Sequence, residues 1–254
     1  MPFRRLADSN PTRLNALEAA RKKLAASTGS AILIPPTLAT QLDLGSATSI
    51  YSRFKKEVGD IAPALASQVA ATTHLEETAH RLRLLTTQAL HNIQAAIERG
   101  DLPAEVRGHY QLAPNQDTLP DIVTPADVVL WAHRIVTGDA ARLASGSPAQ
   151  VGPGPLAWPT TAQITTTITT LDTAETAQLQ AKEKTDNEED QAAALTSEVD
   201  FFIKDLWDTI EFNLRALDAP GLRRRAREWG VIYATRPGET PDPEPAPVPV
   251  PPVV

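Results

Sequence analysis

The sequence contains no cysteine, and aromatic residues make up only 5% of its 254 positions. The lack of cysteine excludes disulfide bonds, thiol catalysis and thiolate metal ligands. Because aromatic side chains are scarce, a core must consist mainly of Ala, Leu, Ile and Val, whose small size allows helices to approach closely. The hydrophobic content of 42% is enough for a sizeable core in a chain of this length.

Long apolar runs are also missing. No segment approaches the roughly 18 consecutive apolar residues that a membrane-spanning helix needs. The start of the chain, Met-Pro-Phe-Arg-Arg-Leu-Ala-Asp, lacks the apolar stretch of a secretory leader. We therefore expect no membrane span and a cytoplasmic location; the alternative is an extracellular protein exported by a route without a cleaved leader.

The common catalytic and cofactor motifs are absent. The chain has no Gly-Lys dipeptide of a phosphate-binding loop, no Gly-x-Gly-x-x-Gly, no Gly-x-Ser-x-Gly and no His-Glu-x-x-His. The formal net charge of −7 argues against general affinity for nucleic acids or anionic membranes, because both attract cationic surfaces. We expect a protein that is not an enzyme and has no cofactor and no nucleic-acid partner.

What the sequence does contain is a long helical pattern at residues 159–217, whose only proline or glycine is the initial Pro159. Its second half carries apolar residues three or four apart, a stripe that must be buried against another helix: Leu195, Val199, Phe202, Leu206, Ile210, Leu214 and Leu217. Near its start, Ile164, Ile168 and Leu171 keep this spacing within a Thr-rich run. Threonine also suits strands, but the run shows no strict alternation, so we expect a helix.

The middle of this pattern, residues 182–190, is charged on every face. We expect that no part of it packs in a core. It is either a solvated segment, a break between two helices, or a site that faces a partner.

A second long helix is expected at about residues 46–99. Pro63 either begins a helix or kinks a longer one. The residues expected to be buried are Leu65, Val69, Leu75, Leu82, Ala89, Ile93 and Ala96, flanked by Leu85, Leu90 and Ile97. The simplest arrangement is an elongated all-α bundle of two long antiparallel helices, completed by short flanking helices.

Shorter elements are marked by caps and turns. Asn10 before Pro11 is expected to cap a basic helix that ends near Ser27. Thr124, with Asp127 as its capping-box acid, begins a helix expected to end at Gly138. The extended segments 31–34 and 231–235 are expected to pair as a minor two-stranded sheet.

One pattern resembles a metal-binding element. Glu77-Thr-Ala-His80 matches the Glu-x-x-His spacing of di-iron bundles. Such a site needs a second copy of the element, and no histidine follows His133. We therefore expect an exposed polar face at Glu77 and His80, with Glu76 and His80 as an i,i+4 pair, and no metal ligands.

The sharpest basic cluster lies in a short helix expected at residues 221–229: Arg223, Arg224, Arg225 and Arg227, next to Trp229. One interpretation is a phosphate or nucleic-acid contact with a stacking aromatic ring. The favoured interpretation places the cations near the helix C-terminus, where the dipole stabilises them, with Trp229 packed on the bundle. A third pairs the arginines with tail acids of this or another subunit: Glu239, Asp242 and Glu244.

The C-terminal segment 237–254 alternates proline with other residues, a composition that favours polyproline II and cannot form a core by itself. We expect a single bundle domain over residues 1–236 and an extended tail over 237–254. The tail residues expected to insert into a groove are Val248, Val250, Val253 and Val254.

These features favour a non-enzymatic structural protein that forms a homo-oligomer or polymer, with its tail docked on a neighbouring subunit. The alternative is an adaptor that presents the polyproline tail to a heterologous protein. A metal-binding or enzymatic bundle is less favoured, since it depends on Glu77 and His80 alone.

Overall fold

The computed structural model describes residues 2–26, 32–113, 118–146, 154, 156–235 and 237–238. The chain divides into two compact units. Unit 1 comprises Met1–Pro63 and Thr185–Val254, and unit 2 comprises Ala64–Lys184. Residues 1–236 were predicted to form a single domain; we describe them as these two units.

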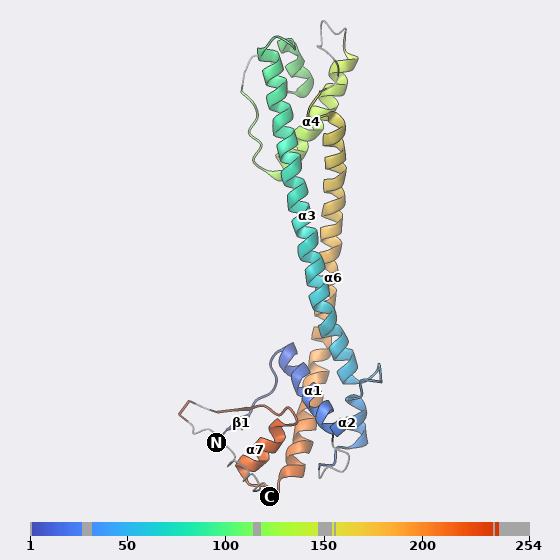
Figure 1. The fold of residues 1–254 in the computed structure, drawn as a ribbon, viewed down its shortest axis with the longest axis vertical. Helices are drawn as coiled ribbons and strands as arrows, with labels where there is room; N and C mark the ends of the chain where they lie inside the picture. The colour runs from blue at the N-terminus through green and yellow to red at the C-terminus, as the bar shows by residue number, and fades with distance from the viewer. Residues whose placement is uncertain are drawn as a thin grey trace, which may run out of the picture. The chain divides into compact units, whose positions relative to one another are not determined.

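The predicted all-α architecture, built on two long antiparallel helices, is confirmed. Helix α3 spans Ile50–Glu98 and helix α6 spans Thr161–Leu214, and each contributes to both units. The two helices run in opposite directions, as the colours of Figure 1 show. The sheet of the described residues has only two strands. Within these residues, no helix combines the length and apolar content needed to cross a bilayer.

Unit 1 packs short elements against the N-terminal part of α3 and the C-terminal part of α6. These elements are β1 (Phe3–Arg4), α1 (Asn10–Ala26), α2 (Pro36–Gln41), α7 (Ala219–Arg227) and β2 (Tyr233–Ala234). Leu206 and Phe202 of α6 are buried, as predicted, in a core shared with Leu17 of α1 and Phe54 of α3.

Unit 2 packs η1 (Ala104–Tyr110) and α4 (Pro125–Ala144) against the C-terminal part of α3 and the N-terminal part of α6. Its core brings together Leu82 and Ile93 of α3, Ile135 of α4 and Ile164 of α6. The cores of the two units have no residue in common.

Helix α3 continues without interruption through Pro63, so this proline does not begin a new helix. The predicted buried face is correct at Leu82, Ala89 and Ile93 and half-buried at Ala96. It is wrong nearer Pro63, where Leu65 and Val69 are exposed. The buried positions there are Ala64 and Thr78, which are two seven-residue steps apart. Residues seven apart do not return to the same angle on a helix with 3.6 residues per turn, so the buried face rotates gradually along α3. Near Pro63 this face contains Ala64, and Leu65 faces water.

Helix α6 is continuous through residues 182–190, which excludes the predicted break. The expectation that nothing there packs is also wrong, because Thr185 is buried. Thr185 lies two seven-residue steps after the buried Leu171 and two before the buried Val199. Ala192, one step after Thr185, is also buried. Small side chains thus continue the apolar stripe where charged residues occupy the other faces.

The Thr-rich start of α6 is helical, as predicted. Thr165, Thr169 and Thr173 each donate the side-chain hydroxyl to the backbone carbonyl four residues earlier. These bonds satisfy the hydroxyl groups within the helix itself, so the threonines need no strand partner.

The two-stranded sheet forms with a different partner from the one predicted. β2 pairs antiparallel with β1, with Phe3 opposite Ala234 and Arg4 opposite Tyr233. The described part of segment 31–34 does not pair because Ile34 is buried in the core and the side-chain amide of Asn213 bonds both the N–H and the C=O of Leu33.

Helix α4 begins as predicted and ends later. Thr124 and Asp127 form a complete capping box, but the helix passes through Gly138 to Ala144. Gly138 is required by packing: a Cβ atom there would lie 2.7 Å from the backbone oxygen of His109. Helix α1 differs at its cap, since Ser9 exchanges hydrogen bonds with Thr12 in the role predicted for Asn10.

Candidate functional site

An apolar groove of about 950 Å³ lies in unit 2. We call it the α4 groove. It lies between α3, the start of α4 and α6, and its apolar lining residues are Leu75, Ala79, Val123, Pro125, Ala126, Val128, Val129, Leu130 and Leu171. Three elements therefore contribute to one apolar surface.

The position of the α4 start is determined by local chemistry. The backbone N–H of Asp127 donates to the Thr124 hydroxyl at 3.1 Å, and the Asp127 carboxylate accepts from the Thr124 backbone at 2.9 Å. The Asp127 carboxylate also accepts from the Thr124 hydroxyl at 2.7 Å. This bond, together with the one from the Thr124 backbone N–H, lowers the pKa of Asp127. The cap fixes where the helix begins, and it thereby places Val123 and Val129 at the groove.

The walls of the α4 groove are open to water. Val123 is 60% exposed and Leu130 is 46% exposed. Concave apolar surfaces of this size are typical of binding sites for ligands or partners.

Ionisable side chains also line the α4 groove. Arg83 and His80 come from α3 and His133 from α4, while the acids are Glu76, Asp172 and Glu175. Arg83 has no ion pair with any described residue. The guanidinium of Arg83 is therefore available to an acidic group.

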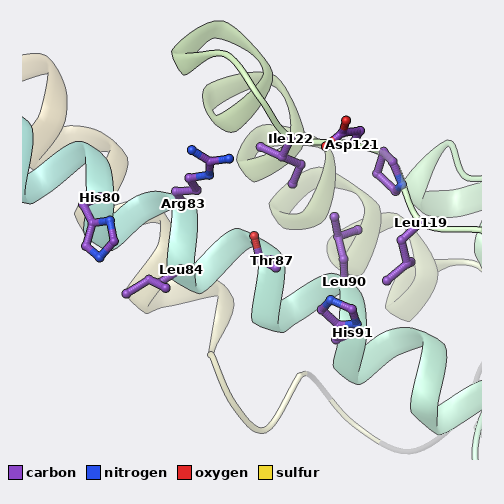
Figure 2. Close-up of a pocket in the computed structure, with 10 residues that line it drawn as sticks. His80, Arg83, Leu84, Thr87, Leu90, His91, Leu119, Asp121 and Ile122 are labelled. Atoms are coloured by element: carbon purple, nitrogen blue, oxygen red, sulfur yellow. The ribbon is translucent and has the colours of Figure 1, made fainter.

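A second hollow of about 450 Å³ adjoins the α4 groove and shares His80 and Arg83 with it. Figure 2 shows that its lining side chains come from one face of α3, including Leu90 and His91, and from the connector at residues 119–122. Arg83 thus stands at the junction of the two hollows.

Buried polar networks connect the elements of unit 2. Asp139 of α4 accepts hydrogen bonds from the Tyr110 hydroxyl at 2.9 Å and from Arg142 at 2.8 Å. Arg142 also donates to the carbonyl oxygen of Gly154 at 2.6 Å. Burial and the nearby Asp139 charge raise the pKa of Tyr110, so its phenol remains protonated and donates to Asp139. The network connects η1, α4 and the chain that leads into α6.

Arg107 is a second buried cation. It donates to the carbonyl oxygens of Ala113 at 2.8 Å and Thr118 at 3.2 Å, and to the side chain of Gln94. These carbonyl groups come from the connector that continues into the groove. The burial of Arg107 and Arg142 could not be identified from sequence, because it depends on partners outside their own helices: Ala113 and Gln94 for Arg107, and Tyr110 and Gly154 for Arg142.

The predicted basic cluster lies on α7 in unit 1. Arg224, Arg225 and Arg227 are exposed and Arg223 is half-buried. The Arg227 guanidinium lies 5.5 Å from the centre of the Tyr233 ring, and Arg225 pairs with Glu228 at 3.6 Å. Helix α7 places Arg224, Arg225 and Arg227 in its last turn, and Arg223 lies in the middle of the helix.

Trp229 differs from the arginines. It is buried in the core of unit 1, which matches the favoured interpretation and removes it from the residues available for surface interaction. The interaction role of the four arginines stays a prediction. The tail residues Val248, Val250, Val253 and Val254 lie outside the described residues.

The predicted polar face at Glu77 and His80 is exposed on α3. Three other carboxylates meet in unit 1, namely Glu57 and Asp60 of α3 and Glu188 of α6. Lys56 pairs with Glu57 at 3.0 Å and Asp60 at 3.1 Å, which raises the pKa of Lys56 and offsets part of the negative charge. We assign no ligand to this acidic cluster.

Comparisons with known proteins give no relative: no family model, no curated protein and no solved structure matches the chain.

Proposed function

We propose that this protein is a non-enzymatic structural protein whose copies self-associate, with the tail, residues 237–254, docked on a neighbouring copy. The observation that supports the proposal is the amount of apolar surface left open in a single chain. On α6, Phe201 is 74% exposed and Phe212 is 64% exposed, and Val123 and Leu130 add open apolar surface in unit 2. Open apolar grooves and exposed aromatic side chains are features of surfaces that bind a partner.

The tail is suited to linking copies. Polyproline II is stiff before it binds, so docking costs little conformational entropy. At about 3.1 Å per residue, residues 237–254 extend over roughly 55 Å, which is enough to reach a second molecule. The valines of the tail supply apolar side chains without a folded core.

Deletion of residues 237–254 tests the proposal. We expect the full chain to form oligomers in sedimentation velocity and light scattering, and the deletion variant to dissociate. The helical circular dichroism of the two proteins should be the same. Equal association of both proteins would refute the linking role of the tail, and a strictly monomeric full chain at high concentration would refute self-assembly.

An adaptor is the second candidate, because the alternating prolines of the tail match ligands that bind aromatic grooves of other proteins. It predicts a monomeric full chain whose tail peptide binds a polyproline-recognition domain directly. The sedimentation experiment therefore separates the two candidates.

A further inference from the structure

We propose that the α4 groove of one copy is the acceptor for the tail of another, and that Arg83 fixes the direction of the tail by pairing with Asp242 and Glu244. This inference rests on the proposed function and names the surface that receives the tail. It depends on three properties of the groove and the tail: apolar character, charge and length.

The apolar surfaces correspond. Residues 245–254 contain only proline, alanine and valine. In polyproline II, every third residue shares an edge, so Pro245, Val248 and Pro251 form one continuous apolar edge. The α4 groove offers aliphatic walls from three elements, with Val123 and Leu130 open to water.

The charges determine the orientation. The tail carries Asp242 and Glu244 immediately before its uncharged segment. Arg83 has no ion pair among the described residues, and His80 lies beside it in the lining of both hollows. Glu76, Asp172 and Glu175 would repel acids elsewhere along the rim. The tail acids therefore fit at Arg83, and the uncharged segment fits past the acidic rim.

The lengths agree with this orientation. Along α3, Leu75 lies roughly 12 Å from Arg83 at 1.5 Å per residue. About four residues of polyproline II cover that distance at 3.1 Å each. With Glu244 at Arg83, Val248 therefore lies at the apolar wall near Leu75.

A charge exchange in the full chain tests the pairing. We expect Arg83→Glu to weaken self-association at least threefold, measured by sedimentation equilibrium at low salt. Combining it with Asp242→Arg and Glu244→Arg in the same chain should restore association. The matched control is Arg81→Glu, two residues away on α3, which lines a different hollow and should leave association unchanged.

Substitutions of exposed wall residues test the apolar contact. Val123→Asp and Leu130→Asp should each weaken association about tenfold without loss of helical circular dichroism, because both side chains are exposed in the single chain. Leu143→Asp is the control, since Leu143 is exposed on α4 outside the α4 groove.

Photo-crosslinking locates the contact directly. With p-benzoylphenylalanine at position 248 and a mixture of ¹⁴N- and ¹⁵N-labelled full chains, crosslinks should join chains of different isotope and map to residues 75–83 or 123–130. Crosslinks only within one chain, or to α7, would overturn the proposal. The proposal is also overturned if Arg83→Glu and Leu130→Asp associate as well as the natural chain while tail deletion abolishes association. That outcome leaves the proposed function intact. If tail deletion itself has no effect, the proposed function fails.

Discussion

At the scale of single residues, the most consequential contact is the buried pair of Asp139 and Arg142. Both side chains are almost fully buried, and the Arg142 guanidinium pairs with the Asp139 carboxylate at 2.8 Å. We expect Asp139→Asn to cost about 3–5 kcal/mol of unfolding free energy, because the variant removes a buried carboxylate that pairs with Arg142 and accepts a hydrogen bond from Tyr110. Urea denaturation followed by circular dichroism measures the loss.

The matched control for this pair is an exposed one. Arg99 and Asp101 pair at 2.9 Å, with both side chains more than half exposed. Asp101→Asn should change stability by less than about 1 kcal/mol, since water screens the pair. Equal effects of the two substitutions would show that burial does not strengthen the Asp139 contact.

At the scale of elements, α4 depends on a glycine in its interior. A Cβ at Gly138 would clash with His109 and Tyr110, so Gly138→Ala should destabilise the protein by about 1–3 kcal/mol despite the higher helix propensity of alanine. Gly59 of α3 has no atom within 4 Å of an added Cβ, and Gly59→Ala should stabilise by about 0.5–1 kcal/mol. Thermal unfolding of both variants provides the comparison. A stabilising Gly138→Ala would contradict the close approach of α4 and η1.

The start of α4 gives a prediction about pH. The Thr124 hydroxyl is the largest cause of the lowered pKa of Asp127. A depressed carboxyl pKa in the folded state stabilises the cap above the ordinary pKa of aspartate, and this stabilisation is lost as the pH falls through the folded-state value. Thr124→Ala should return the Asp127 pKa toward 3.8, which NMR titration of the carboxyl group measures. An unchanged pKa would contradict the capping bond.

At the scale of the whole molecule, two units with separate cores share two continuous helices. Leu206→Ala in unit 1 and Leu82→Ala in unit 2 should each cost about 2–5 kcal/mol through lost burial and a cavity. Because the cores share no residue, the double variant should lose the sum of the two within about 0.5 kcal/mol. Calorimetry measures the three variants.

The native tryptophans help to assign the transitions. Trp207 and Trp229 lie in the core of unit 1, whereas Trp131 packs against the core of unit 2. Variants that retain one tryptophan at a time would report each unit by fluorescence. A coupling energy well above 0.5 kcal/mol would show that α3 and α6 transmit the loss of one core to the other.

Much of the fold could be predicted from sequence because its determinants are local. The stripe through Val199, Leu206 and Ile210 has helical spacing, and Thr124 lies three residues from Asp127. Such patterns involve residues within one or two turns, so they specify a helix and its first residue before any tertiary contact forms. The sequence also indicated a small sheet, but it predicted segment 31–34, in place of β1, as the partner of the C-terminal strand.

Only the tertiary structure decided which distant residues meet. It paired β2 with β1, placed Gly138 against His109, and turned Ala64 inward in place of Leu65. It also joined Asp139 with Tyr110 and assembled the α4 groove from three separate elements. These contacts depend on the way helices pack around shared cores. A helical repeat predicts that a face is buried, but the residues of the partner determine which side chains that face presents.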